Sequence, residues 1–304
     1  MNPHVSNLTQ LASVRRYELL DGKGAGLKVI DCDNGKIRFL LNESKALDIM
    51  QIYYKGENIS FVSKNGFSMR SDIPFSQRFE GGMLYTCGLD NIGYREGYPL
   101  HGTFHNLPAN IIKIECNDEF LFVEAEMECS ELFGKNLVMR RRVFSNIKSN
   151  NIIISDTLTN NGYRDEDYCL LYHVNLGYPL LEEGCEIHGA IENVKPRTPF
   201  AKEQIQNFTE ITSPVLNQEE TCYFLSFKKP CISLINPKSH REFSLEWSQN
   251  TLPSFVEWKS MASGDYALGL EPCTSELDSG FSKKVIKPQE SIDTYLIMTI
   301  KDIE

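Results

Sequence analysis

The 304-residue sequence lacks a paired-cysteine motif and lacks any long apolar run. Its nine cysteines form no C-x-x-C pair, and most stand in apolar, strand-like stretches. This pattern favours reduced core residues over disulfides or a zinc site. No run of 18 apolar residues occurs, and the first residues, MNPHVSNLTQ, lack the charged and apolar regions of a signal peptide. We therefore expect a cytoplasmic protein that has no membrane partner.

Positive charge is also scarce. The chain carries 31 basic against 41 acidic residues, which gives a formal net charge of −10. The one tight basic cluster, residues 140–142, begins the apparent strand VMRRRVFS, and we interpret it as a solvated strand face. Because phosphate binding needs a net positive surface, nucleic acid is not expected as a partner. A small, uncharged molecule fits this composition better.

Linkers and cofactor motifs are missing too. No Pro/Gly/Ser-rich segment and no fixed-period repeat divides the chain, so we predict one domain over residues 1–304. There is no P-loop, no dinucleotide fingerprint and no G-x-S-x-G motif. If the chain is an enzyme, the chemistry left to it is acid–base catalysis without a cofactor.

What the sequence does contain is apolar alternation with a period of two, from residue 26 to the end. Close turn signals such as Asn34-Gly35 and Asn161-Gly162 separate the strands, and no long helical pattern alternates with them. We therefore predict an all-β fold, a large antiparallel β-sandwich. Residues 1–25 are expected to form an N-terminal arm or short helix, and binding loops are expected within residues 67–110 and 176–220. The predicted strands include LKVIDCD, KIRFLLN, EFLFVEAEMEC, NLVMRRRVFS, NIIISDTLTN, CYFLSF, CISLIN, EFSLEWS, YALGLE and TYLIMTI.

The first polar cluster lies among glycines and aromatics in residues 78–110. It contains Arg78, Asp90, His101 and His105. The two histidines have the i, i+4 spacing of a zinc-binding helix, but the glutamate of that motif is missing and nearby glycines and Pro108 disfavour a helix. A polar, aromatic-lined loop site is favoured, with a structural histidine as the alternative and no metal site expected.

The second cluster is the stretch CLLYHVN, residues 169–175. On a strand, side chains alternate between faces, so His173 and Asn175 face the same space. A histidine in such an apolar run is more often a packed core residue than a catalyst. The carboxamide two residues away favours a functional role, because it can fix a tautomer or hold a hydroxyl group beside the imidazole.

The third cluster is YALGLEPCT, residues 266–274. On a strand, Glu271 shares its face with Gly269 and Ala267, which leaves room beside the carboxylate for a ligand. A carboxylate before a proline at the end of an apolar strand is costly to bury without a partner. The alternative is a strand-end glutamate that reaches solvent.

The order of these motifs resembles the aldose 1-epimerase (galactose mutarotase-like) superfamily. The motifs are Arg78, then the Leu-His-Gly of His101, then His173 with Asn175, and finally Gly-Leu-Glu271-Pro. The resemblance is strongest to a bacterial branch of unassigned function. It implies that His173 is the general acid at the sugar ring oxygen and Glu271 the general base at the anomeric hydroxyl group. It also implies that His101 and Arg78 hold the sugar and stabilise charge.

The leading hypothesis is therefore a mutarotase of carbohydrate metabolism that interconverts the anomers of a free or modified sugar. Two alternatives stay open: a carbohydrate-binding or sensing protein on the same fold, and another sugar enzyme such as an isomerase or lyase. Asp90, Trp258 and Lys259 are further candidates for sugar contacts, and strand packing is the alternative for the last two. A lysine in the pocket would favour an acidic or phosphorylated sugar.

Overall fold

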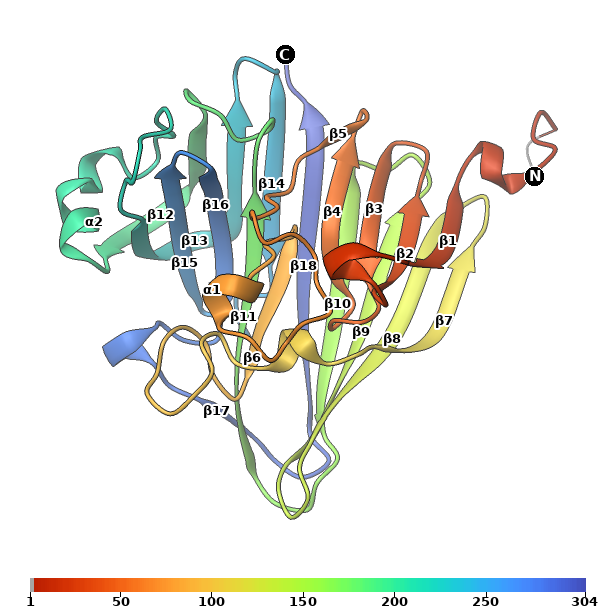
Figure 1. Cartoon of the computed structure of the whole chain (residues 1–304), viewed down its shortest axis with the longest axis horizontal. Helices are drawn as coiled ribbons and strands as arrows, with labels where there is room; N and C mark the ends of the chain where they lie inside the picture. The colour runs from red at the N-terminus through yellow and green to blue at the C-terminus, as the bar shows by residue number, and fades with distance from the viewer. Residues whose placement is uncertain (1–2) are drawn as a thin grey trace.

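The computed structural model describes residues 3–304 and contains two antiparallel sheets (Figure 1). The smaller sheet has five strands in the order in which they follow along the chain. They are β1 (Ser13–Glu18), β2 (Lys28–Asp33), β3 (Ile37–Asn42), β4 (Asp48–Tyr54) and β5 (Glu57–Asn58).

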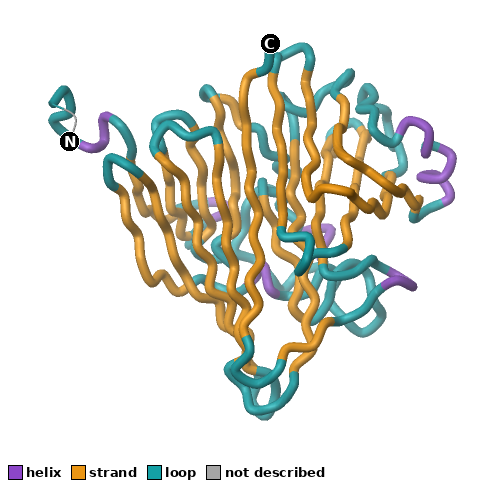
Figure 2. Tube along the Cα trace, turned by 180° about the vertical axis from the view of Figure 1, so that it is seen from behind, coloured by secondary structure: helices purple, strands orange, loops and turns teal. Residues whose placement is uncertain are grey.

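The larger sheet has 13 strands and spans the whole width of the molecule, as the rear view shows (Figure 2). Its order is β17-β11-β16-β15-β13-β14-β18-β10-β9-β8-β7, with β6 paired to β11 and β12 paired to β13. These strands are β6 (Leu84–Leu89), β7 (Asn110–Cys116), β8 (Phe120–Ser130), β9 (Asn136–Asn146), β10 (Asn151–Asn160), β11 (Glu166–Leu176), β12 (Glu186–Pro196), β13 (Thr221–Asn236), β14 (Arg241–Trp247), β15 (Ser254–Ala262), β16 (Asp265–Cys273), β17 (Lys284–Ile286) and β18 (Ser291–Asp302).

Helices are short and lie outside the sheets. They are α1 (Phe75–Arg78), α2 (Pro199–Glu203) and the single-turn 3₁₀ segments η1 (Leu8–Gln10), η2 (Gly22–Gly24), η3 (Phe104–Asn106), η4 (Ile205–Asn207) and η5 (Asp278–Gly280). No helix within residues 3–304 has the length and apolar character that a membrane crossing needs. The all-β sandwich predicted from the alternating pattern is confirmed.

The main core lies between the small sheet and the half of the large sheet behind it (Figure 1). Strand β10 buries every second residue, including Ile152 and Ile154, in the same core cluster as the small-sheet residues Phe39 and Leu41. Such alternation is what a strand with one face on the core and one on solvent requires. The nine cysteines are free, and seven of them are buried, in agreement with the sequence interpretation.

Strand β11 differs because almost all of its side chains are buried. Tyr172 and Val174 belong to the main core on one face, whereas Cys169 and Leu171 belong to a second apolar cluster on the other. The continuous apolar run of this strand reflects burial on both faces. His173 therefore lies on the face of the second cluster, away from the main core.

The N-terminal segment contains more strand than the sequence indicated. Of residues 1–25, residues 1 and 2 lie outside the described part of the chain, and η1 forms one turn. Strand β1 then pairs with β2 along its whole length, from Ser13 opposite Asp33 to Glu18 opposite Lys28. Half-buried Val14 packs against the main core, which ties this edge strand to the sandwich.

The two regions in which we expected binding loops each contain a strand. Strand β6 lies within residues 67–110, and its six residues are all buried, so no polar alternation marks it. Strand β12 lies within residues 176–220 and is mostly exposed. The stretches CYFLSF and CISLIN form one strand, β13, instead of two. Pro230 is tolerated there because it falls in the gap between the ladder to β15, which ends at Leu225, and the ladder to β14, which begins at Cys231.

The expectation of a solvated face at residues 140–142 is wrong for the middle residue. Arg140 and Arg142 are partly exposed and pair with Glu126 and Glu124, respectively. Arg141 points the other way and is fully buried, because successive strand side chains alternate between faces.

Candidate active site

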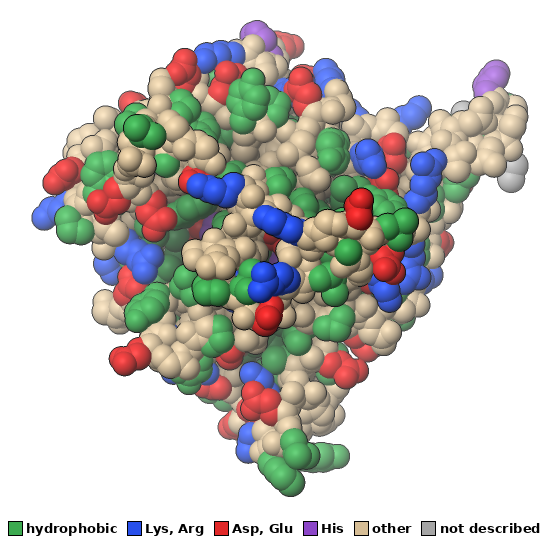
Figure 3. Space-filling view, viewed as in Figure 1, with side chains coloured by type: hydrophobic (Ala, Val, Ile, Leu, Met, Phe, Trp, Pro, Cys, Tyr) green, Lys and Arg blue, Asp and Glu red, His purple; other side chains and the backbone are tan. Residues whose placement is uncertain are grey.

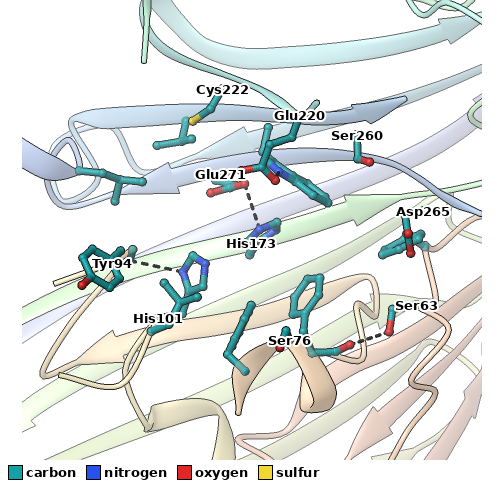
Figure 4. A pocket seen from close by; sticks show the side chains of 18 of the residues that line it. Ser63, Ser76, Tyr94, His101, His173, Glu220, Cys222, Ser260, Asp265 and Glu271 are labelled. Carbon is teal, nitrogen blue, oxygen red and sulfur yellow. Dashed lines mark hydrogen bonds and ion pairs between the residues drawn. The ribbon is translucent and has the colours of Figure 1, made fainter. Parts of the chain in front are cut away.

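A cavity of about 650 Å³ lies over the part of the large sheet formed by β11, β16, β15 and β13 (Figure 4). The opposite wall comes from residues 61–65, helix α1 and the loop that carries residues 93–101. This volume is in the ordinary range for a small-molecule site. His173, Glu271, His101 and Trp258 line it, so four of the residues singled out in the sequence come together.

The centre of the cavity holds an imidazole and a carboxylate in contact. Val174 pairs with Leu270 in the ladder between β11 and β16, which sets His173 opposite Glu271. Their atoms Nε2 and Oε1 are 3.1 Å apart, and both residues are at least 95% buried. Figure 4 shows the two side chains pointing toward each other across this short gap.

Burial shifts the pKa values of the two groups apart. Desolvation, together with the nearby Glu220 carboxylate, raises the pKa of Glu271 well above its usual range. Desolvation and the proximity of His101 lower the pKa of His173 well below its usual value. The pair therefore retains a single proton over a wide pH range and titrates as a unit.

Gly269 makes this contact possible. A β-carbon at this position would lie 2.6 Å from Glu271 Oε1, 2.9 Å from His173 Cε1 and 3.2 Å from the Trp258 ring. These three side chains occupy the space that any larger residue at position 269 would need. The small face noted beside Glu271 in the sequence is thus filled by the acid–base pair and an indole.

His101 lies at the rim of the loop wall. Its backbone adopts a left-handed conformation with φ of 62°, and the loop is fixed by hydrogen bonds from His101 N–H to the Gly93 carbonyl and from Gly88 N–H to the His101 carbonyl. The ring centroid is 4.9 Å from that of Phe75 and 5.8 Å from that of His173. Burial lowers the pKa of His101 to about 4, so the ring is neutral at physiological pH.

Trp258 covers the pair from strand β15. Its ring centroid is 5.6 Å from that of His173 in an edge-on arrangement. The indole Nε1–H donates to Glu220 Oε2 at 2.7 Å. Glu220 therefore holds the indole against the acid–base pair.

Two other predicted site residues lie beside the cavity but are not among its lining residues. Arg78 is buried, donates from Nη1 to the Tyr85 hydroxyl at 3.0 Å, and lies over the Phe75 ring. Asn175 donates to the carbonyl of Gly82 and to that of His173, both at 2.9 Å. In this conformation Arg78 and Asn175 bind protein groups behind the wall.

Asp90 and Lys259 are engaged elsewhere. Asp90 Oδ1 accepts a hydrogen bond from Thr103 N–H in the loop behind His101. Lys259 lies on the face of β15 opposite the cavity, where its ammonium group donates to the Phe208 carbonyl and is 3.3 Å from Glu257 Oε1. Lys259 therefore contributes no positive charge to the cavity wall.

The two histidines whose spacing resembled a zinc motif lie in different places in the structure. His101 lines the cavity, whereas His105 is buried with Nδ1 2.6 Å from Asp48 Oδ2. No group of three or more His, Cys, Asp or Glu residues within residues 3–304 is arranged to hold a metal ion.

Several lining residues were missed from the sequence. The alternation that places Trp258 on the cavity face also predicts Val256 and Ser260 there, so this signal was available. The residues contributed by loops and by the ends of β12 and β13 carry no local signal. The missed residues with side chains on the wall are Phe61, Ser63, Lys64, Asn65, Phe75, Ser76, Phe79, Tyr94, Leu100, Arg197, Glu220, Cys222, Val256, Ser260, Asp265 and Leu277.

Comparison with known proteins supports the fold. The model of a family described as "Domain of unknown function (DUF4432)" matches residues 24–285. No curated protein matches the sequence. A solved structure from Klebsiella pneumoniae, described as a candidate aldose 1-epimerase, is similar with a TM-score of 0.84 and 20% identity, covering 95% of this chain and 83% of that one.

Two further solved structures share the fold at lower identity. A galactose mutarotase-like protein from Clostridium acetobutylicum has a TM-score of 0.72 and 15% identity, over 97% of this chain and 100% of that one. Galactose 1-epimerase from Lactobacillus acidophilus has a TM-score of 0.64 and 11% identity, over 96% and 100%. The resemblance stated from the sequence motifs is confirmed at the level of the fold.

Proposed function

We propose that this chain, which belongs to the DUF4432 family, is a cofactor-independent aldose 1-epimerase that interconverts the α and β anomers of a sugar. The observation that carries the proposal is the contact between His173 and Glu271 inside the cavity. An acid and a base that share one proton are what reversible ring opening of a cyclic sugar requires.

In the proposed reaction, the shared proton rests on Glu271, because burial raises the pKa of that carboxyl group and lowers the pKa of His173, and it passes to His173 when the sugar binds. Glu271 removes the proton of the anomeric hydroxyl group while His173 protonates the ring oxygen, and the bond between C1 and the ring oxygen breaks. The product is an open-chain aldehyde, with the proton now on Glu271 and the imidazole neutral. After rotation about the C1–C2 bond, the ring hydroxyl group attacks the other face of C1, His173 takes its proton, and Glu271 returns a proton to O1. When the product leaves, the proton returns from His173 to Glu271, and the pair ends the cycle as it began.

The surroundings of the pair fit this exchange. Burial disfavours the charged form of each group, so the empty site holds the proton on Glu271 with both groups neutral, and the charged pair that starts the reaction forms only next to the sugar. Neutral His101 stands beside His173 and offers a hydrogen bond without competing for the proton. Trp258 offers an aromatic face to the C–H groups of the sugar ring.

The test is the replacement of each member of the pair. His173→Gln and Glu271→Gln should each lower the rate of anomer exchange by about 10²–10⁴-fold, because each removes one proton-transfer partner. Saturation-exchange NMR or polarimetry on a panel of aldoses measures the rate, and circular dichroism checks the fold. The surface variants His188→Gln and Glu246→Gln are matched controls and should retain the wild-type rate. Wild-type rates in either pair variant would falsify the assignment.

A carbohydrate-binding or sensing protein is the second candidate. The observation that favours it is the position of Arg78, which is held by Tyr85 and does not line the cavity. A protein of this kind would bind sugars with similar affinity before and after Glu271→Gln and would not accelerate anomer exchange.

A further inference from the structure

Arg78 and Lys259, two cations expected to contact the sugar, do not line the cavity. Among the described residues that do, the cations are Lys64 and Arg197. The Lys64 side chain is 70% exposed and ion-paired with Asp265, whereas the Arg197 side chain is 25% exposed. Basic and acidic side chains are intermixed over this face of the molecule (Figure 3), so charge alone does not mark a functional residue. The position and the contacts of Arg197 set it apart.

The backbone of Arg197 is tied to the large sheet at the edge of the cavity. Arg197 directly follows β12, whose last residue, Pro196, pairs with Tyr223 of β13. Its backbone N–H donates to the Cys222 carbonyl at 2.9 Å. Cys222 lines the cavity on the same sheet as Glu271 (Figure 4). Arg197 therefore has a fixed place at the start of the excursion through α2 and η4.

The guanidinium group of Arg197 is held side-on by one carboxylate. Nε donates to Asp278 Oδ2 at 2.6 Å, and Nη2 donates to Asp278 Oδ1 at 2.9 Å. Within residues 3–304, no oxygen atom accepts a hydrogen bond from Nη1, and the nearby Cys222 thiol is a weak acceptor. The side-on pair thus fixes the plane of the group and leaves donors at its other end unused.

The charge of Arg197 acts on groups at the centre of the cavity. Burial has the largest influence there, raising the pKa of Glu271 and lowering that of His101, and the charge of Arg197 lowers the pKa of both. Arg197 therefore favours the ionised Glu271 that forms when the proton passes to His173. Because all three groups line the cavity, the field of Arg197 extends over the space that a sugar would fill.

From this geometry we propose that Arg197 binds the substrate: Asp278 orients its guanidinium group, and Nη1 donates to an oxygen atom of the bound sugar. The inference rests on the proposed function and adds a cation to the site. The contact needs no particular orientation of the sugar, because every hydroxyl and ring oxygen atom can accept a hydrogen bond. Asp278, which is not among the described lining residues, is then a positioning residue that acts through Arg197.

A neighbouring ion pair provides the matched control for a purely structural role. Lys195 Nζ is 2.8 Å from Glu276 Oε2, and each of these residues precedes a member of the Arg197–Asp278 pair by two positions. Lys195 is not among the described residues that line the cavity. Lys195→Met therefore removes a tie between the same two segments and leaves the cavity wall as it is.

Arg197→Met tests the sugar contact, because it removes the charge and the donors. Saturation-exchange NMR measures kcat/KM for anomer exchange on D-glucose, D-galactose, D-mannose and D-xylose, and circular dichroism checks the fold. For the sugar that the wild type converts fastest, kcat/KM should fall by about 10–100-fold. Arg197→Lys should recover part of the loss, since it restores the charge without the side-on pair. A fall no larger than that in Lys195→Met would overturn the inference and leave the epimerase function intact.

The pH profile is a readout that a structural tie would not move. Loss of the Arg197 charge raises the pKa of Glu271, so the acid–base pair keeps its shared proton to higher pH. The alkaline limb of the kcat/KM profile should therefore move to higher pH in Arg197→Met and stay in place in Lys195→Met. A limb that stays in place or moves to lower pH in Arg197→Met would contradict the position assigned to this charge.

Asp278→Asn tests the orienting role. Asp278 has a left-handed backbone with φ of 54°, which asparagine tolerates. The weaker side-on pair should lower kcat/KM by about threefold or more. In combination with Arg197→Met it should cause no further loss, because it acts through Arg197. Losses that add up in the double variant would show that Asp278 does not act in this way.

Binding separates the inference from the proposed function. Dissociation constants of the same four sugars are measured in the wild type, Arg197→Met and Lys195→Met. If the wild type binds a sugar without accelerating its exchange, the epimerase function fails, and a dissociation constant raised about tenfold or more in Arg197→Met alone still supports the sugar contact. An unchanged constant would overturn that contact. A wild type that binds none of the four sugars would count against both proposals.

Discussion

Strand β11 separates two sites at which carboxylates are fully buried. On the core face, Tyr172 donates to Asp156 at 2.8 Å, and Arg141 contacts Asp156 at 2.7 Å and Asp48 at 2.5 Å. His105 Nδ1 is 2.6 Å from Asp48 Oδ2. We call these five residues the Arg141 cluster. On the cavity face, His173 is the one ion-pair partner of Glu271 within residues 3–304.

The pKa values differ accordingly. Burial alone would raise the pKa of Asp48, but the hydrogen bond from His105 and the charge of Arg141 outweigh it and hold that pKa below its usual value. Burial opposes protonation of His105, and its two carboxylate neighbours, Asp48 and Glu80, still raise its pKa. At Glu271 the charge of Arg197 does not outweigh burial and the negative charge of Glu220, so the pKa is raised. Carboxylates that are equally buried therefore behave differently because their neighbours differ. The carboxylates of the Arg141 cluster stay charged, whereas Glu271 holds a proton that it can transfer.

Disruption of the Arg141 cluster should have the largest effect, a loss of unfolding free energy. Arg141→Met removes the cation shared by Asp48 and Asp156 and leaves both buried carboxylates without it, which should cost about 3–5 kcal/mol of unfolding free energy. Urea denaturation followed by circular dichroism measures the change. Arg140→Met, one residue away on the exposed face of the same strand, is the control and should cost less than about 1 kcal/mol. Equal losses in the two variants would contradict the structural role of the cluster.

A substitution beside the acid–base pair in the cavity should lower activity and leave stability nearly unchanged. In Gly269→Ala, the new methyl group would overlap Glu271 and His173 and push the pair apart, while the backbone is not in the left-handed region and accepts alanine. We expect kcat to fall roughly 100-fold, the scale of a displacement of about 1 Å in a catalytic group. The urea midpoint should change little. Gly189→Ala on exposed strand β12 is the control, and a wild-type kcat in Gly269→Ala would show that the close contact is not needed.

The sequence predicts these two sites unequally. Period-two alternation predicts the sandwich. It places Glu271 on a face beside Gly269 and His173 on a face beside Asn175, and the ladder between β11 and β16 then brings His173 and Glu271 together. The same alternation predicts that Arg141 points away from its two neighbours, so its burial was readable from the pattern. It was missed because a basic triplet favoured a surface interpretation.

Other features depend on contacts that are distant in sequence. Arg197 and Glu220 stand at opposite ends of a 22-residue excursion through α2 and η4, and both return to the cavity wall. Asn175 shares a face with His173, as predicted, yet the backbone carbonyls of Gly82 and His173 take its amide donors. Tertiary neighbours of this kind decide whether a side chain reaches a ligand, and no local pattern encodes them.

Glu257 is a third buried carboxylate, and the dependence of stability on pH can test its protonation. It is fully buried beside one cation, Lys259, and burial raises its pKa to about 7 despite that cation. The folded protein therefore holds a proton that the unfolded chain releases at lower pH, so this group's contribution to stability falls as pH rises toward about 7 and is constant above it. The slope reaches at most about 1.4 kcal/mol per pH unit. Urea denaturation from about pH 5 to pH 8 should show a steeper decline in wild type and in Glu246→Gln than in Glu257→Gln, which keeps only the contributions of other groups such as Glu271, and parallel curves for all three would contradict it.

The smallest effect concerns the charge next to the acid–base pair. Glu220 raises the pKa of Glu271 by its negative charge and also holds the Trp258 indole. Removing that charge in Glu220→Gln lowers the pKa of Glu271, so the pair loses its shared proton at a lower pH. The alkaline limb of the kcat profile should therefore move to lower pH by less than about one unit, because the side chain at position 220 is solvent-exposed and its field is screened. Glu246→Gln should leave the limb in place. A limb that stays fixed or moves to higher pH in Glu220→Gln would mean that Glu271 is not the group that sets it.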